Sequence, residues 1–463
     1  MLFSGIPFLF YFLPCVLLVY FIVPQKGRNA VLLAASLFFY GWGEPKFLLF
    51  MVFSIVQGYV FARLIGRGRR KKLFLTLSLV LSFALLGYCK YADFFIENFN
   101  AVTGLSLPLL KIALPIGISF YTFQIASYEI DVYRGDVAAQ HNFIDFAAYV
   151  AMFPQLIAGP IVRYRDIAPQ LKERTHSLEA AASGASRFAV GLGKKVLVAN
   201  VLAQLVSAYK ASAEQTALYA WLYAIAFTLQ IYFDFSGYSD MAIGLGRIFG
   251  FSFPENFRYP YIAKSITEFW RRWHMSLGSW FRDYVYIPLG GNRVSKTKWL
   301  RNILVVWLLT GLWHGAAWNF VLWGLFFAVF LTAEKLWYGR ALAKTRVFKH
   351  IYVLLLVIVS FVLFDANSVG EAAATIGGLF GAAGVSAVNP ISLYYLRSFA
   401  VVFLIGIVGA TPLLKRAVEQ LGSTRAGAMV VDVLEPLVLV SVLAVSTGYL
   451  VDGSFNPFLY FRF

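Results

Sequence analysis

Charged side chains are scarce in this chain of 463 residues: only 14% are Asp, Glu, Lys or Arg, whereas 60% are hydrophobic and 18% aromatic. An average soluble domain is about 25% charged and about 45–50% apolar. Soluble cores of this size cannot bury so many apolar side chains. The composition therefore excludes a soluble globular protein and predicts an integral membrane protein.

Cysteine is nearly absent, since only Cys15 and Cys89 occur, each inside an apolar run. This excludes a disulfide framework, a C-x-x-C redox site and a zinc-cysteine cluster. The first apolar stretch has no basic residue before it and no small-residue cleavage pattern. We therefore expect a retained first span rather than a signal peptide.

Acidic residues are also few, with 23 Asp and Glu against 40 Lys and Arg, which gives a formal net charge of +17. The basic residues form short runs beside apolar segments: GRGRRKK (66–72), RYR (163–165) and WRRWH (270–274). Runs in such positions are typical of cytoplasmic loops that contact anionic lipids. We expect membrane lipids as partners, and no nucleic acid.

Apolar runs of the length that a bilayer requires, about 20 residues, recur along the chain. They cover residues 5–23, 73–89, 108–128, 187–208, 217–233, 302–335 (as one helix or two), 350–364, 394–411 and 428–449, with a shorter pair at 30–43 and 46–62. This pattern predicts an all-α polytopic membrane protein with roughly eleven transmembrane helices.

One apolar stretch, FIDFAAYVAMFPQLIAGPIVRYR (143–165), has basic residues on both sides that favour the cytoplasm. We therefore predict a re-entrant loop, broken near Pro154 and at Gly159-Pro160. Backbone broken at membrane depth is tolerated only inside protein or beside a water-filled cavity. The stretch thus indicates a central cavity.

Residues 251–302 differ from the spans around them, with nine Lys/Arg against three acidic residues and many aromatics. Such a segment suits helices that lie in the membrane interface, and PLGGN (288–292) predicts a turn. We expect one membrane domain over 1–463, with N-terminal helices in 1–250, an interfacial and catalytic core in 251–335, and C-terminal helices in 336–463.

Two of the five histidines stand out. His141, His176 and His350 have polar or basic neighbours and are expected in exposed loops, but His314 lies in an apolar run (303–332) without another ionisable group. Ionisable residues in membranes tend to face cavities or pathways. His274 lies in an aromatic and basic segment. His314 is either a hydrogen-bonded structural ring or a group for proton transfer, and His274 is either an interfacial side chain that snorkels to the headgroups or a second group for proton transfer.

The glycines on either side of His314, Gly311 and Gly315, either leave space beside the ring or let two helices approach. Asp234 and Asp240 in YFDFSGYSDMAIGLG (232–246) either line a proton path or pair with basic residues in the bundle. Two histidines without cysteine or an H-E-x-x-H motif do not supply the three or four ligands of a zinc site. We expect no metal, and no G-x-S-x-G nucleophile motif occurs.

Several long motifs resemble the membrane-bound O-acyltransferase superfamily, and within it the bacterial alginate O-acetyltransferase branch. They are SITEFWRRWHMSLGSWFRDYVYIPLGGNR (265–293), LLTGLWHGAAWNFVLWG (308–324), LPIGISFYTFQIASYEIDVYRGD (114–136), FPQLIAGPIVRYRD (153–166) and YFDFSGYSDMAIGLG (232–246). The resemblance extends over nearly the whole chain. It implies a helical fold around a central tunnel, and His314 as the catalytic histidine with His274 as the second polar residue.

The resemblance further implies transfer of an acetyl group from a cytoplasmic thioester, acetyl-CoA, to a hydroxyl that enters from the other side, with His314 as general base. Arg271, Arg272 and Arg282 are the expected contacts of the coenzyme A phosphates. The implied partners are an extracytoplasmic acyltransferase of the SGNH type and polysaccharide synthesis machinery. The implied location is the bacterial cytoplasmic (inner) membrane, and the implied process is O-acetylation of an exopolysaccharide such as alginate, or of a cell-wall polymer.

Three alternatives remain. The first is D-alanyl transfer to teichoic acids within the same superfamily. The second is a proton-coupled transporter or flippase that uses Asp234, Asp240 and the histidines. The third is a structural scaffold, which leaves His314 without a role.

Overall fold

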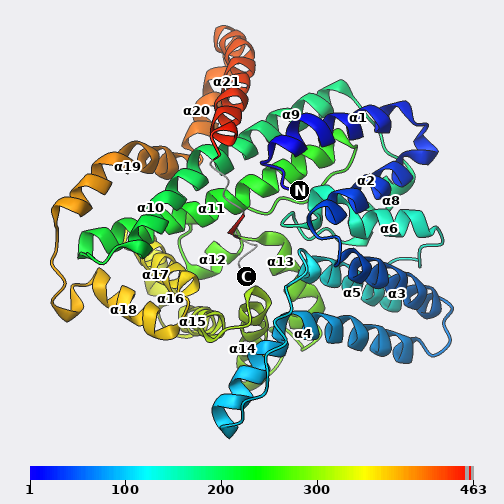
Figure 1. Cartoon of the computed structure of the whole chain (residues 1–463), viewed down its shortest axis with the longest axis horizontal. Helices are drawn as coiled ribbons and strands as arrows, with labels where there is room; N and C mark the ends of the chain where they lie inside the picture. The colour runs from blue at the N-terminus through cyan, green and yellow to red at the C-terminus, as the bar shows by residue number, and fades with distance from the viewer. Residues whose placement is uncertain (454–457, 460–463) are drawn as a thin grey trace. The chain divides into compact units, whose positions relative to one another are not determined.

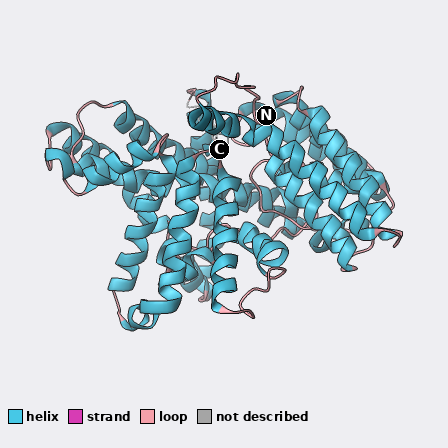
Figure 2. Ribbon diagram, turned by 90° about the horizontal axis from the view of Figure 1, so that it is seen from below, coloured by secondary structure: helices cyan, strands magenta, loops and turns pink. Residues whose placement is uncertain are grey.

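The computed structural model describes residues 1–453 and 458–459, and within these ranges helices and loops make up the chain, without a strand (Figures 1 and 2). The predicted all-α class is confirmed. Among the described residues, eight helices are long and apolar enough to cross a bilayer; the expected count of roughly eleven is not confirmed. The end of the predicted C-terminal section, at 454–457 and 460–463, lies outside the described residues.

The chain divides into two compact units, one of Met1–Phe188 and Met241–Pro254, the other of Ala189–Asp240 and Glu255–Phe463. Two long helices contribute to both: α9 (Leu178–Gly193) and α11 (Ala217–Ile248). The other helices of the first unit are α1 (Leu13–Ile22), α2 (Arg28–Gly43), α3 (Leu48–Gly66), α4 (Lys71–Thr103), α5 (Ile118–Arg134), α6 (Phe143–Ala151), α7 (Phe153–Leu156) and α8 (Tyr164–Lys172).

The first unit contains the predicted broken segment. Helix α6 ends at Ala151 and the four-residue α7 follows, because Pro154 lacks the N–H that would bond to a carbonyl one turn earlier. The Phe153 amide bonds instead to the Ser36 hydroxyl of α2, at 3.0 Å. At Gly159 a Cβ would lie 2.5 Å from the Gln155 Cα. Residues 146–164 are all buried, so this broken backbone lies inside protein, as predicted.

Helix α5 begins ten residues later than the span predicted at 108–128. Residues 104–117 form a loop, and α5 starts after Gly117 and ends before Gly135. Both glycines have φ angles near +80°, at 76° and 84°, in the left-handed region where only glycine is free of strain. Hydropathy alone does not reveal this boundary, because the loop SLPLLKIALP is itself apolar.

The second unit begins with a π-helical segment, η3 (Lys194–Ala199), that leads into α10 (Asn200–Ala211). Its remaining helices are α12 (Ile266–Trp270), α13 (Met275–Phe281), α14 (Lys296–His314), α15 (Trp318–Ala333), α16 (Gly339–Lys344), α17 (Phe348–Asp365), α18 (Val369–Leu379), α19 (Pro390–Gly409), α20 (Leu413–Gly422) and α21 (Arg425–Val451). The apolar run at 302–335 is thus two helices. The predicted turn at 288–292 is confirmed, and two short helices, α12 and α13, occupy the basic segment before it.

Apolar side chains cover the outer surface of the long helices. Helix α21 is strongly apolar and its apolar stretch is not buried inside the protein; Val433 is 63% exposed and Leu437 59%. In water such a surface would aggregate, whereas lipid tails cover it without cost. The protein is a multi-pass membrane protein.

Candidate active site

His314 is the last residue of α14 and lies in an aromatic enclosure. Its ring centroid is 5.0 Å from that of Trp313, 5.0 Å from that of Trp323 and 5.1 Å from that of Phe364, with ring planes crossing at 80° to 82°. The imidazole is 7% exposed. The titratable ring therefore has edge-on aromatic walls from three helices, α14, α15 and α17.

Glycine brings these helices together. A Cβ on Gly311 would lie 2.3 Å from the Phe320 carbonyl oxygen, and one on Gly324 would lie 2.2 Å from that of Trp307. A Cβ on Gly315 would meet the Phe320 ring at 2.1 Å. Of the two roles left open by the sequence, the glycines serve close helix approach, because α15 fills the space beside α14.

The Phe364 wall of this enclosure is fixed from behind. Asn319 donates its amide to the carbonyls of Phe364 and Ala366, at 3.3 and 2.8 Å. The adjacent Asp365 carboxylate pairs with Lys210 at 2.7 Å and accepts the Tyr223 hydroxyl at 2.7 Å. The end of α17 is therefore tied to α10, α11 and α15.

His274 lies between α12 and α13 and is 2% exposed. Its backbone adopts φ 44° and ψ 52°, the left-handed region, which costs a non-glycine residue about 1–3 kcal/mol. Its Nδ1 lies 3.2 Å from the Asn256 side-chain oxygen. Burial lowers the pKa of the imidazole to about 3, so the ring is neutral at physiological pH.

A single indole contacts both histidines. The Trp313 ring centroid lies 5.6 Å from that of His274 and 5.0 Å from that of His314. Residues forty positions apart in sequence thus both contact one ring. The structure places both predicted histidines in one neighbourhood.

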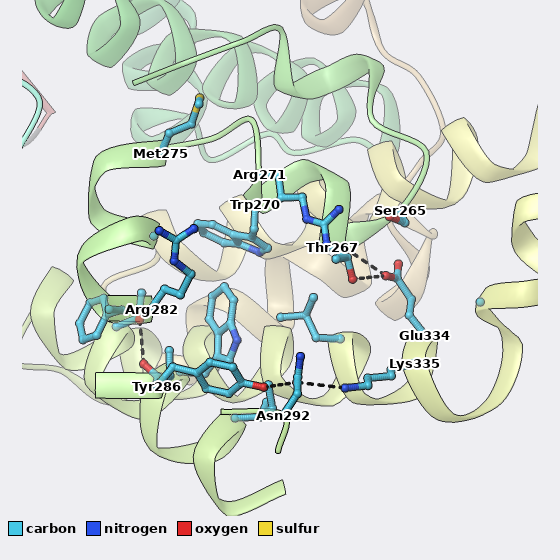
Figure 3. Close-up of a pocket in the computed structure, with 18 of the residues that line it drawn as sticks. Ser265, Thr267, Trp270, Arg271, Met275, Arg282, Tyr286, Asn292, Glu334 and Lys335 are labelled. Carbon is cyan, nitrogen blue, oxygen red and sulfur yellow. Dashed lines mark hydrogen bonds between the residues drawn. The ribbon is translucent and has the colours of Figure 1, made fainter. Parts of the chain in front are cut away.

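A cavity of about 1080 Å³ adjoins this neighbourhood and is lined by His274 but not by His314. Thr310, one turn before His314 on α14, is also in its lining. Figure 3 shows the Trp270 indole in the middle of this cavity, with Arg271 and Arg282 nearby. Five cationic side chains and one carboxylate line the cavity: Lys264, Arg271, Arg282, Lys335, Lys349 and Glu334.

The carboxylate of Glu334 is occupied by backbone. It accepts the amide of Ile266 at 2.6 Å and both the amide and hydroxyl of Thr267 at 3.1 Å (Figure 3). A carboxylate at the first amides of a helix satisfies donors that lack intrahelical partners. Glu334 therefore anchors the start of α12, and the excess charge in the cavity remains positive.

A second polar cluster lies in the lining of the cavity. The Tyr286 hydroxyl donates to the Asn292 oxygen at 2.5 Å, and the Lys335 ammonium donates to the same oxygen at 3.2 Å (Figure 3). That ammonium also lies 4.2 Å from the Trp299 ring centroid, a cation–π contact.

The three predicted arginines separate into two groups. Arg271 and Arg282 line the cavity, whereas Arg272 is not among its lining residues. Arg272 pairs with Glu268 at 2.8 Å and donates to the Arg258 carbonyl. Arg282 also pairs with Asp283 at 2.7 Å, and its side chain is 62% exposed.

Both aspartates of the motif at 232–246 are in ion pairs. Asp234 pairs with Lys195 at 2.5 Å and accepts the Leu459 amide at 2.8 Å; Asp240 pairs with Lys194 at 2.7 Å. Of the two roles left open, pairing in the bundle is the one that the structure shows.

The other histidines vary in their surroundings. His141 is exposed as expected, but His350 is half-buried at the start of α17. His176 is also half-buried and contacts the Tyr20 hydroxyl at 3.0 Å and the Arg28 guanidinium at 3.1 Å. The expectation of an exposed loop residue was wrong for His176 and His350, because neighbouring polar residues in sequence do not show what folds over a side chain.

Two site residues were missed at the level of sequence. Asn256 and Glu334 touch the histidine loop and its preceding helix, respectively. Asn256 lies eighteen residues before His274 in a stretch without regular structure. No periodicity links such a residue to its partner, and only the folded backbone does.

The family model described as "MBOAT, membrane-bound O-acyltransferase family" matches residues 119–369, which include both histidines and the whole cavity. This is more than half of the chain. The chain belongs to the membrane-bound O-acyltransferase family. It is therefore an O-acyltransferase, and the resemblance to this family is confirmed.

Individual relatives place the chain within this family. It is 42% identical over 499 residues to the probable alginate O-acetylase AlgI of Azotobacter vinelandii, with all of both chains covered. It is 35% identical to the peptidoglycan O-acetyltransferase of Helicobacter pylori, over 83% of this chain and 81% of that one. The teichoic acid D-alanyltransferase of Bacillus subtilis is 31% identical over only 47% of this chain and 58% of its own. The chain lies in the alginate O-acetylase branch of the family.

Proposed function

We propose that this protein is an O-acetyltransferase of the bacterial cytoplasmic (inner) membrane. It takes an acetyl group from acetyl-CoA on the cytoplasmic side and transfers it for O-acetylation of an exopolysaccharide or cell-wall polymer. The names of two relatives matched over most of the chain support the acetyl group and the polymer. The observation that carries the donor is the cavity with His274 in its wall and five cations around it.

The chemistry of coenzyme A fits this cavity. Its diphosphate and 3′-phosphate are polyanions, for which Arg and Lys are the usual protein contacts. Its pantetheine arm is a long, weakly polar chain that suits a cavity lined by Trp270, Leu277 and Trp307. The one carboxylate, Glu334, is engaged by three hydrogen bonds at α12, and five cations outnumber it in the lining.

In the proposed reaction the acceptor hydroxyl oxygen attacks the thioester carbonyl carbon, and His314 takes the hydroxyl proton. The carbon–sulfur bond then breaks, and the thiolate leaves into the cavity that is proposed to hold coenzyme A, which we call the donor cavity. A positioned base contributes about 10²–10⁴ in rate to such a step, because a hydroxyl is a weak nucleophile at neutral pH. The aromatic enclosure of His314 keeps water from competing with the acceptor.

The acetyl group reaches the polymer through partners in this proposal. An extracytoplasmic acyltransferase of the SGNH type and polysaccharide synthesis machinery complete the modification. Alginate is the first polymer to test, because the relatives with full coverage bear that name. D-alanyl transfer is less favoured, since its named relative matches under half of this chain.

The decisive experiment measures thiol release from acetyl-CoA by membranes that contain the chain. His314→Ala should lower the rate at least 100-fold with normal expression and membrane insertion. Arg271→Ala and Arg282→Ala should raise KM for acetyl-CoA about 5- to 50-fold with little change in kcat. Arg272→Ala is the matched control, because its guanidinium pairs with Glu268 outside the cavity lining.

A second arm separates acetyl-CoA from a carrier-bound thioester. Acetyl-pantetheine lacks all the phosphates of coenzyme A and should react with a KM that the two arginine changes leave unaltered. If membranes with the unmodified protein release thiol no faster than His314→Ala membranes, with either donor, the proposed function is contradicted.

A further inference from the structure

The carboxamide of Asn256 has only one orientation that its surroundings permit. The Ser276 backbone amide points at the Asn256 side-chain oxygen, with N and O 3.2 Å apart, and the Ser276 hydroxyl donates to it at 2.9 Å. A backbone N–H is always a donor. Rotating the carboxamide by half a turn would place its NH₂ group against this donor, so the oxygen must face Ser276.

This orientation determines which nitrogen of His274 carries the proton. Nδ1 lies 3.2 Å from the same Asn256 oxygen, which only accepts hydrogen bonds. Nδ1 must therefore carry the hydrogen. In a neutral imidazole the other nitrogen then has the lone pair, so Nε2 is an acceptor and cannot donate a hydrogen bond.

The Nε2 atom is buried and has no hydrogen-bond partner among the described residues. Leaving a buried acceptor unsatisfied costs about 1–3 kcal/mol, so native proteins rarely retain one without a use. The left-handed backbone at His274 adds a further cost. These two costs fall on one residue, which lines the donor cavity.

The loop around Asn256 holds this strained conformation from both sides. The Asn256 backbone carbonyl accepts a hydrogen bond from the amide of Met275, the residue directly after His274, at 3.0 Å. Two residues further on, the Arg258 amide donates to the Arg272 carbonyl at 2.9 Å, just before His274. Asn256 is fully buried, so this arrangement is shielded from water.

We propose that Asn256 is a positioning residue that fixes His274 as the Nδ1–H tautomer and thereby makes Nε2 a proton acceptor in acyl transfer. His274 then acts as a second base rather than as a hydrogen-bond donor to the developing oxyanion. The hydroxyl has one proton: His314 takes it, and Nε2 of His274 accepts it in turn and passes it to the thiolate that leaves when the carbon–sulfur bond breaks. The catalytic part rests on the proposed function, whereas the tautomer does not.

The aromatic rings packed against His274 carry no charge. Phe235 of α11 lies edge-on at 4.7 Å between ring centroids, and Trp313 of α14 lies at 5.6 Å. Asn256 is the polar contact of the ring. The charged side chains nearest in sequence are those of Arg271 and Arg272, of which only Arg271 lines the cavity. A charge introduced at residue 256 is therefore the dominant electrostatic change at the imidazole.

The test is Asn256→Asp, which keeps an oxygen at the same position and adds a negative charge. The carboxylate favours imidazolium and should raise the pKa of His274 by about 1–3 units. Since protonation removes the Nε2 lone pair, thiol release from acetyl-CoA, followed from pH 3 to 9, should acquire an acid limb from residue 274 between about pH 4 and 6, above the value of about 3 in the unmodified protein. Ser276→Ala, which removes one donor to the same oxygen but keeps the Ser276 amide, should leave the limb unmoved.

The tautomer itself is read by nitrogen NMR of the full-length protein labelled with ¹⁵N-histidine in lipid bilayers, with His274→Gln used for assignment. A protonated Nδ1 and an unprotonated Nε2 support the inference. A protonated Nε2 in the unmodified protein, or an acid limb that Asn256→Asp leaves in place, overturns it. If no donor supports thiol release, the proposed function fails while the spectrum still decides the tautomer.

Discussion

The imidazole of His314 lies edge-on to the indole of Trp323, with ring centroids 5.0 Å apart and planes at 80°. Trp323 is 1% exposed and belongs to α15, so the helix that follows His314 in sequence also forms a wall beside its ring. An edge-on aromatic neighbour fixes the ring plane of the histidine and excludes water. This contact makes the geometry of His314 depend on α15.

Trp323→Ala should therefore lower acyl transfer more than tenfold and reduce the free energy of unfolding by about 3–5 kcal/mol, because a large buried ring is lost. Trp323→Phe keeps an aromatic wall and should retain most of the activity. Thiol release and thermal unfolding in detergent measure the two effects. Full activity in the alanine variant would show that the wall does not position His314.

The sequence predicted much of the fold because apolar runs and basic clusters are local signals. His314 was identified as a candidate since it interrupts residues 303–332, which otherwise lack an ionisable group. The buried break near Pro154 was also predictable, since proline and glycine act on their own backbone.

The contacts of the site were less predictable, because they join residues that are distant in sequence. Nothing in the local pattern shows that Glu334 reaches Thr267, sixty-seven positions earlier, or that Asn256 reaches His274. The predicted start of α5 was wrong for a different reason. The preceding loop is as apolar as a span, and only the left-handed turn at Gly117 ends it.

The ion pair between Lys195 and Asp234 is buried, with side chains 2% and 4% exposed. Asp234→Asn removes the anion and leaves the lysine charge uncompensated, which should cost about 3–5 kcal/mol of unfolding free energy. The Lys195→Met, Asp234→Leu double variant should lose less, because it leaves no isolated charge. Thermal unfolding of the purified protein measures both.

The pair of Lys194 and Asp240 provides the control, since its side chains are 25% and 14% exposed. Asp240→Asn should destabilise less than Asp234→Asn, because a partly exposed lysine can extend its charge along the helix toward the membrane interface. Equal losses in the two variants would contradict the assignment of the larger effect to burial.

Close packing of α14 on α15 depends on Gly324, whose added Cβ would lie 2.2 Å from the Trp307 carbonyl oxygen. Because backbone cannot yield as a side chain does, Gly324→Ala should separate the helices and cost about 1–3 kcal/mol. Acyl transfer should also fall, since His314 ends α14.

Gly87→Ala in α4 is the matched control: no atom lies within 4 Å of its added Cβ, so alanine should stabilise by up to about 1 kcal/mol. If Gly324→Ala and Gly87→Ala change the free energy of unfolding in the same direction, steric contact is ruled out as the cause.

Burial of His274 makes stability depend on pH. The pKa of its imidazole falls from 6.5 in the unfolded chain to about 3 in the folded protein, because desolvation disfavours the cation. Between these values the unfolded chain binds more protons than the folded protein. Stability from this group is therefore complete above pH 6.5 and is lost as pH falls toward 3, by up to about 1.4 kcal/mol per pH unit.

His274→Gln removes the titration and should flatten the decline of the thermal midpoint between pH 6.5 and 4.5. The slopes are compared rather than the midpoints, because glutamine also changes the contact with Asn256. His141→Gln, at an exposed histidine, should keep the original slope. An unchanged slope in His274→Gln would mean that the imidazole already titrates near its ordinary pKa in the folded protein, and that water reaches Nε2.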